Sequence, residues 1–150
     1  MEQKEMIDLL RQVASGTMDV EQAALKLKEE PFEDLGFAKI DHHRAMRQGV
    51  AEVIYGEGKT PEQIFRIAEA MKEKGQKAVL ITRMNKESAI YVGEHLELQY
   101  DEVSRIGFIG EAPIKDGDGK IVVATGGTSD IPVAEEAART AETLGNEVVR

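Results

Sequence analysis

The sequence predicts an α/β protein in three consecutive parts: an N-terminal helical arm over residues 1–30, a small α/β domain over 37–110, and the start of a Rossmann-like parallel-sheet domain over 119–150. Two observations predict this class. The first 30 residues carry apolar side chains at helical spacing only, whereas the later residues alternate short apolar runs with helical patterns. A parallel sheet buried on both faces needs more strands than 119–150 provides, so we expect this last domain to be incomplete within these residues.

Composition excludes several classes of protein. The chain has 150 residues, with 19 basic and 28 acidic side chains and a net charge of −9, which argues against sequence-independent nucleic-acid binding and against an anionic membrane surface. The absence of Cys excludes a disulfide, a thiolate metal site and a cysteine nucleophile within these residues. Apolar runs are short and the N-terminus lacks a signal-peptide pattern, which predicts a soluble, cytoplasmic protein.

The helical arm is expected to be a pair of short helices. Gly16 interrupts two apolar series at helical spacing, and the arm carries no pattern that suggests chemistry. We therefore interpret it as a docking or oligomerisation element. The two series are Met6, Leu9, Leu10 and Val13, and then Val20, Ala23, Ala24 and Leu27.

A linker is predicted over residues 31–36, followed by a short strand within 37–44 and another over 50–55. Thr60 and Gln63 form a capping box that starts a helix, in which Ile64, Ile67, Ala68 and Met71 are the expected buried positions. Gly75 ends this helix. Residues 77–82 read as a buried strand and 86–95 as a helix, while the pattern over 96–109 does not assign its strands.

The most informative stretch is the turn at 126–130, between an apolar run and a helical pattern. The first N–H groups of a helix lack intrahelical partners, and the helix dipole adds positive potential there, so such turns hold phosphates. The alternative is a capped strand–helix turn that binds no ligand. The turn consists of Gly126, Gly127, Thr128, Ser129 and Asp130, and the helix after it is expected to face the sheet through Ala134, Ala137, Ala138 and Ala141.

A second group of polar residues lies in the middle of the chain. Its cations fall at or near the ends of predicted elements, where they could converge on a phosphate or carboxylate. The alternative is that each cation is a solvated surface residue or is paired with a local carboxylate such as Glu52, Asp41 or Glu57. Adjacent His42 and His43 are badly placed to chelate one ion, which argues against a transition-metal site. The cations are Arg44, Arg47, Lys59 and Arg83.

Segments spread in order over nearly the whole chain resemble the LarB family. They are residues 32–44, 47–49, 52–54, 58–63, 82–83 and 127–137. The resemblance implies a C-terminal domain related to the PurE-type carboxylases and mutases. It also implies the activity of pyridinium-3,5-biscarboxylic acid mononucleotide synthase, the first step of nickel-pincer cofactor synthesis. In that reaction, the pyridinium ring of nicotinic acid adenine dinucleotide is carboxylated by carbon dioxide or bicarbonate, and the phosphoanhydride is cleaved to release AMP.

The resemblance also implies the roles of particular residues. The turn at 126–130 aligns with a PurE-type ribose-phosphate loop, although Gly127 stands where that pattern has its first serine. Ser129 and Asp130 are therefore the stronger substrate-binding candidates, with Gly127 and Thr128 weaker ones. The remaining candidates for the anionic groups of the substrate are Asp41, His43, Arg44, Arg47, Lys59 and Arg83. Mg²⁺ and a homo-oligomeric assembly are implied in the same way, without a dedicated protein metal site.

One departure from the family bears on activity. Family members continue beyond Arg150 and supply there the cysteine that attacks the pyridinium ring, so no catalytic residue is assigned within this chain. The chain would then be a fragment or a shortened protein. Two other functions stay open: a PurE-type enzyme acting on an aminoimidazole ribonucleotide, and a non-catalytic nucleotide-binding or oligomerisation module.

Overall fold

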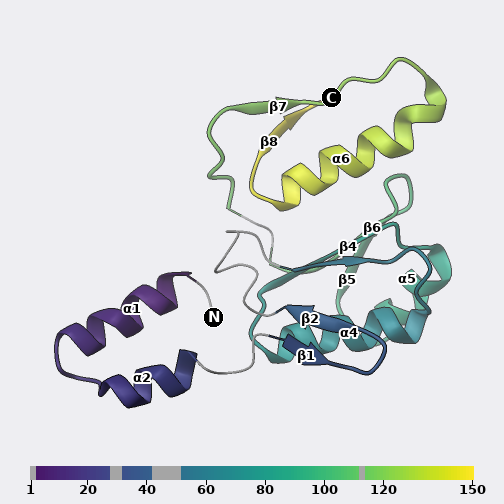
Figure 1. Cartoon of the computed structure of the whole chain (residues 1–150). Helices are drawn as coiled ribbons and strands as arrows, with labels where there is room; N and C mark the ends of the chain where they lie inside the picture. The colour runs from purple at the N-terminus through teal and green to yellow at the C-terminus, as the bar shows by residue number, and fades with distance from the viewer. Residues whose placement is uncertain (1–2, 28–31, 42–51, 112–113) are drawn as a thin grey trace. The chain divides into compact units, whose positions relative to one another are not determined.

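A computed structural model describes residues 3–27, 32–41, 52–111 and 114–150 of the chain (Figure 1). The chain divides into two compact units, Met1–Glu52 and Val53–Arg150. Helices and strands alternate through the second unit, which contains both parallel and antiparallel strand pairs. The predicted α/β class is therefore confirmed.

The first unit begins with two helices, α1 (Gln3–Ala14) and α2 (Val20–Leu27). Leu9 and Ala23 are buried, and Gly16 lies in the turn between the helices with a φ of +73°, a conformation that favours glycine. The helical pair therefore forms where the two apolar series predict it.

The linker predicted over residues 31–36 is wrong in part, because a β-hairpin occupies this region. Strand β1 (Phe32–Asp34) pairs antiparallel with β2 (Lys39–Asp41). The turn is closed by the N–H of Leu35, which donates to the carbonyl of Ala38 at 2.9 Å. Gly36, with a φ of +82°, donates its N–H to Asp34 Oδ1 at 2.8 Å. Local turn chemistry thus makes a strand of residues whose polar composition does not suggest one.

The second unit is built on a four-stranded sheet in the order β3–β4–β6–β5. Its strands are β3 (Val53–Tyr55), β4 (Ala78–Thr82), β5 (Leu98–Asp101) and β6 (Ile106–Gly110). Strands β3 and β4 are parallel, whereas β6 is antiparallel to both of its neighbours. The carboxyl ends of β3 and β4 therefore meet at one edge of the sheet, next to the start of β6.

Two helices cover one face of this sheet, α4 (Pro61–Glu73) and α5 (Lys86–Gly93) (Figure 1). The predicted capping box is present: Thr60 Oγ1 accepts from the Gln63 N–H at 3.2 Å, and Gln63 Oε1 accepts from the Thr60 N–H at 3.0 Å. The residues predicted to be buried are buried, namely Ile64, Ile67, Ala68 and Met71.

The last part of the chain is a strand–turn–helix–strand segment. Strand β7 (Lys120–Val122) leads through the short 3₁₀ helix η1 (Thr128–Asp130) into α6 (Ile131–Thr143), and β8 (Glu147–Val149) returns parallel to β7. Helix α6 contacts β4 and β6 on the sheet face opposite α4 and α5 (Figure 1). Every helix within the described ranges is too short or too polar to cross a bilayer.

One predicted contact of α6 is wrong. Ala138 is fully buried, and Ala134 and Ala141 are half-buried, but Ala137 is exposed. Position 137 lies at the edge of the face that positions 134, 138 and 141 share, about 100° around the axis from the fully buried residue 138, so its side chain reaches solvent.

Candidate nucleotide-binding site

The turn at 126–130 lies at the carboxyl edge of the parallel pair β7–β8, and all five of its residues are exposed. In open α/β sheets, ligands bind outside the carboxyl ends of parallel strands. Thr125 Oγ1 donates to the carbonyl of Gly127 at 3.3 Å, and the same carbonyl accepts the N–H of Asp130 at 3.1 Å. These bonds give the turn a defined shape and leave its outer surface open to a ligand.

The side chains of Ser129 and Asp130 fold back over Gly127. A Cβ built on Gly127 would lie 3.7 Å from Asp130 Oδ2 and 3.8 Å from Ser129 Oγ. Those distances are ordinary contacts, and the φ of −149° at Gly127 is open to any residue. A serine at 127 would therefore fit, so this departure from the PurE-type pattern removes a hydroxyl without changing the shape of the turn.

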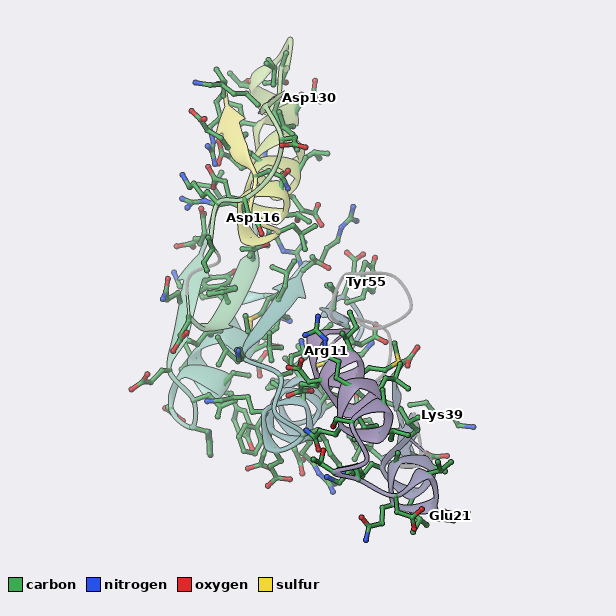
Figure 2. The ribbon with its side chains drawn as sticks, turned by 90° about the vertical axis from the view of Figure 1, so that its left-hand side faces the viewer. Arg11, Glu21, Lys39, Tyr55, Asp116 and Asp130 are labelled. Atoms are coloured by element: carbon green, nitrogen blue, oxygen red, sulfur yellow. The ribbon has the colours of Figure 1, made fainter. Side chains whose placement is uncertain are left out.

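Asp130 occupies the N-cap position of α6, but its side chain makes no capping hydrogen bond. Within the described residues, neither η1 nor α6 receives a side-chain capping hydrogen bond at its N-terminus. The carboxylate stands at one end of α6, while Asp116 marks the other end, near Gly145 (Figure 2). The Asp130 carboxylate is thus available to a ligand. The first two residues of α6 offer no free amide, because the Ile131 N–H donates to the carbonyl of Thr128 and Pro132 has no N–H.

A cavity of about 370 Å³ adjoins this turn. Its walls come from the end of β7, the residues that follow it, the first turns of α6, and Arg150. Its lining is Val122, Val123, Ala124, Thr125, Ile131, Ala134, Glu135 and Arg150. Most of these side chains are apolar, so a ligand whose polar groups contact the turn could bury an apolar part here.

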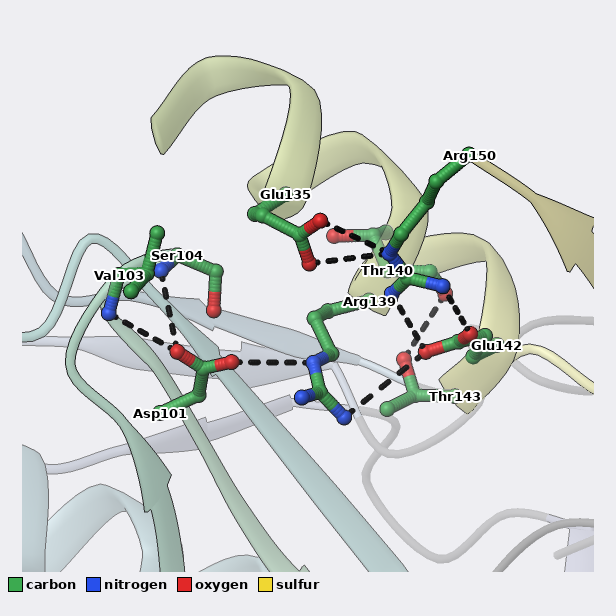
Figure 3. Close-up of polar contacts among 9 residues, drawn as sticks. All are labelled: Asp101, Val103, Ser104, Glu135, Arg139, Thr140, Glu142, Thr143 and Arg150. Carbon is green, nitrogen blue, oxygen red and sulfur yellow. Dashed lines mark hydrogen bonds and ion pairs between the residues drawn. The ribbon is translucent and has the colours of Figure 1, made fainter. Parts of the chain in front are cut away.

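Arg150, which the sequence analysis did not single out, follows β8 and pairs with two carboxylates of α6 (Figure 3). Its Nε donates to both oxygens of Glu135 at 2.8 and 3.1 Å, and its Nη1 and Nη2 donate to Glu142 at 2.7 and 3.1 Å. The hydrogen bonds to Glu142 and Glu135 raise the pKa of Arg150, and the bond from Arg150 lowers the pKa of Glu142. Arg150 could have been identified from the sequence as a cation directly after an apolar strand.

The same network reaches the four-stranded sheet through Arg139. Its Nε donates to Asp101 Oδ2 at 3.0 Å, and its Nη1 lies 3.9 Å from Glu142 Oε2 (Figure 3). Burial of the Asp101 carboxylate tends to raise its pKa. Hydrogen bonds from the N–H groups of Ser104 and Val103 and the interaction with Arg139 have a larger opposite effect, so the pKa of Asp101 is lowered. Alternating charges therefore join β8, α6 and β5.

Two of the predicted cations, Lys59 and Arg83, follow the carboxyl ends of β3 and β4. The loop at 56–59 follows β3, and Arg83 follows β4. Gly56 donates its N–H to the carbonyl of Thr82 at 2.7 Å, and a Cβ at Gly56 would lie 2.9 Å from that oxygen, so the close approach requires glycine. Lys59, in the same loop, is half-buried.

Arg83 is paired with carboxylates, as the alternative interpretation allowed. Its Nε donates to Glu136 Oε1 at 3.2 Å and its Nη1 to Glu57 Oε2 at 3.4 Å. The bond to Glu136 raises the pKa of Arg83. Glu57 also accepts from the Tyr55 hydroxyl, which lowers the pKa of Glu57 and raises that of Tyr55.

The predicted convergence of four cations stays a prediction. His43, Arg44 and Arg47 lie outside the described residues, and Asp41 belongs to β2 in the other unit. Across the described ranges, no three His, Asp or Glu side chains gather in a way that could hold a metal ion.

Comparison with known proteins identifies the family. Residues 32–111 match the family described as the LarB/PurE-like N-terminal domain. This chain belongs to the LarB family. A protein of Methanocaldococcus jannaschii, described as uncharacterized, is 29% identical over 153 residues, which cover 97% of this chain and 60% of that protein. Lys59 and Arg83 lie inside the matched LarB segment, whereas the turn at 126–130 follows it.

Proposed function

We propose that this protein carries substrate-binding parts of a LarB synthase that carboxylates the pyridinium ring of nicotinic acid adenine dinucleotide and releases AMP. Family membership supports a carboxylase-type enzyme. The observation that carries the proposal is the exposed turn at 126–130, where the Ser129 hydroxyl and the Asp130 carboxylate stand at the start of α6 and make no capping bond. A dinucleotide offers matching groups, namely phosphates and ribose hydroxyls.

In this proposal, hydrogen-bond donors of the turn bind a phosphate of the dinucleotide, and its carboxylate binds the ribose. The Ser129 hydroxyl donates a hydrogen bond to a phosphate, and the positive end of the α6 dipole adds a favourable potential for that negative charge. Asp130 accepts from ribose hydroxyls, as a carboxylate does in dinucleotide-binding folds. Thr128 and Lys59 are secondary candidates, and Asp41, His43, Arg44 and Arg47 keep their predicted roles toward the anionic groups.

Mg²⁺, which the family resemblance implies, would be held chiefly by the substrate phosphates, with one oxygen of Asp130 as its protein ligand and the other left for a ribose hydroxyl. Magnesium is usually held by one or two carboxylates together with substrate phosphates, and Asp130 supplies one uncapped carboxylate. When bound, the ion would neutralise phosphate charge during cleavage of the phosphoanhydride.

The overall reaction balances without a redox partner. A C–C bond forms between the ring and carbon dioxide as the ring loses a proton, and water cleaves the phosphoanhydride to give AMP. Activation of the ring by a thiolate, which the family resemblance implies, requires a cysteine that these 150 residues do not contain. The proposal therefore assigns binding and orientation of the dinucleotide to this chain.

Calorimetric titration tests the proposal with nicotinic acid adenine dinucleotide, AMP and aminoimidazole ribonucleotide in parallel. We expect the dinucleotide to bind and Ser129→Ala to weaken it. Incubation with bicarbonate and Mg²⁺, followed by mass spectrometry, should show no sustained formation of AMP and the biscarboxylated mononucleotide. Preferential binding of the aminoimidazole ribonucleotide would favour the PurE-type alternative, and binding of none of the three would contradict a nucleotide site.

A further inference from the structure

Two arginines adopt a backbone conformation that is unusual for a residue with a side chain. Among the described residues, Arg83 and Arg105 are the non-glycine residues with positive φ, at +52° and +57°. Arg83 follows β4 and Arg105 precedes β6, its antiparallel neighbour, so the two residues lie beside each other. Such conformations persist where the surroundings hold them, and they cluster at functional sites.

Hydrogen bonds between these two segments hold both backbones. The Met84 N–H donates to the carbonyl of Arg105 at 2.8 Å. In return, Arg105 Nη2 donates to the carbonyl of Arg83 at 3.2 Å and its Nε to that of Met84 at 3.4 Å. The Tyr100 hydroxyl adds a bond to the Met84 carbonyl at 3.0 Å, and the Met84 side chain is fully buried. The Arg105 side chain is therefore committed to the backbone that carries Arg83.

The Arg83 side chain in turn reaches α6. Its Nε bonds Glu136, whose side chain is only 22% exposed, while its Nη1 bonds Glu57 after β3. Glu136 lies in the second turn of α6, six residues after Asp130. A continuous set of contacts thus runs from Arg105 through Arg83 to the helix that begins at the candidate turn.

We propose that Arg83 and Arg105 are positioning residues for the nucleotide-binding turn. Arg105 holds the backbone of Arg83 in its left-handed conformation. The guanidinium of Arg83, bonded to Glu57 on one side and to Glu136 of α6 on the other, then fixes the position of α6. Arginine suits this role because its planar group donates in several fixed directions at once. The contact between Arg83 and α6 is seen in the structure. Its effect on ligand binding depends on the proposed function.

The rival role for Arg83 is direct contact with an anionic group of the substrate. The two roles predict opposite effects of Glu136→Gln. If Arg83 binds the anion, removing the competing carboxylate of Glu136 leaves the affinity unchanged or strengthens it. If Arg83 positions α6, the same substitution weakens binding, although Glu136 is not expected to touch the ligand.

The test combines amide hydrogen exchange with calorimetric titration of nicotinic acid adenine dinucleotide. The variants are Glu136→Gln, Arg83→Met, the double variant of these two, and Arg105→Leu. A further variant, Arg105→Gln, keeps a donor for the carbonyls of Arg83 and Met84. Glu94→Gln, which removes an exposed carboxylate at the end of α5, is the matched control. We expect exchange in residues 131–137 to speed up and affinity to fall, each about three- to fivefold, the size of effect that a partly exposed ion pair supplies.

The outcomes separate the hypotheses. Positioning predicts that the double variant is no weaker than either single one, since both break the same contact, and that Arg105→Gln is closer to wild type than Arg105→Leu. Unchanged exchange in α6, or faster exchange with unchanged affinity, would overturn the proposal. If the wild-type chain binds no dinucleotide, the proposed function fails, and the exchange data still decide whether Arg83 and Arg105 hold α6.

Discussion

At the scale of single residues, the structure separates two roles that sequence alone leaves open for Asp130. A carboxylate at a helix start either caps the helix or binds a ligand, and here it makes no capping bond to η1 or α6. We therefore predict that Asp130→Ala changes the free energy of unfolding by less than about 0.5 kcal/mol, as for an ordinary surface substitution. Dinucleotide affinity should fall about tenfold, the loss expected for a charge-assisted hydrogen bond.

Thermal melting and calorimetric titration on the same preparations measure both quantities. Asp118→Ala is the matched control, because this exposed carboxylate lies in the loop before β7, at the other end of the strand. A lower melting point with unchanged affinity would restore the capping interpretation.

The sequence identifies a site residue when the pattern that marks it lies within a few neighbouring residues. Ser129 and Asp130 belong to one strand–turn–helix pattern, so their exposure at a helix start was predictable. The partners of Arg83 were not, because Glu136 is 53 residues away in sequence. Arg150 was missed for a related reason: its position near the turn depends on the parallel pairing of β7 with β8.

At the scale of elements, α4 shows how a local signal fixes a helix boundary. The Thr60–Gln63 capping box satisfies amides at the helix start that lack intrahelical partners. We predict that Thr60→Ala destabilises the chain by about 1 kcal/mol, the usual cost of losing an N-cap. Urea denaturation followed by circular dichroism measures the change.

Lys74→Ala, at the other end of α4, is the control for this prediction because the cap bonds at that end are made by the backbone N–H of Lys74, which alanine keeps. An unchanged midpoint in Thr60→Ala would mean that Pro61 and the packing of the helix are sufficient to define its start.

Elements that depend on pairing were harder to predict than α4. Residues 96–109 carry no clear alternation, yet β5 and β6 form a hairpin whose β6 strand also pairs with β4. The burial of Ile106, Phe108 and Ile109 comes from both faces of the sheet being covered, which no local pattern within this segment encodes.

At the scale of the second unit, charges connect α6 to the four-stranded sheet. Two ion pairs cross from α6 to that sheet or the residues flanking it, Arg83–Glu136 and Arg139–Asp101, and Glu142 links Arg139 to Arg150. Contacts of this kind depend on ionisation. The stability of this unit should therefore depend on pH in the range where the carboxylates titrate.

The pH dependence has a definite sign. The bond from Arg150 lowers the pKa of Glu142 in the folded protein relative to its ordinary value of 4.5. A lowered carboxylate pKa means that the stabilisation is complete above the ordinary value and is lost as the pH falls through the lower, folded-state value. We predict that Glu142→Gln lowers the melting temperature at neutral pH and that the difference from wild type disappears in acid. Melting curves between about pH 7 and about pH 3 cover this titration. Glu94→Gln should run parallel to wild type throughout, and a Glu142→Gln difference that persists at the acid end would show that Glu142 contributes through packing and not through its charge.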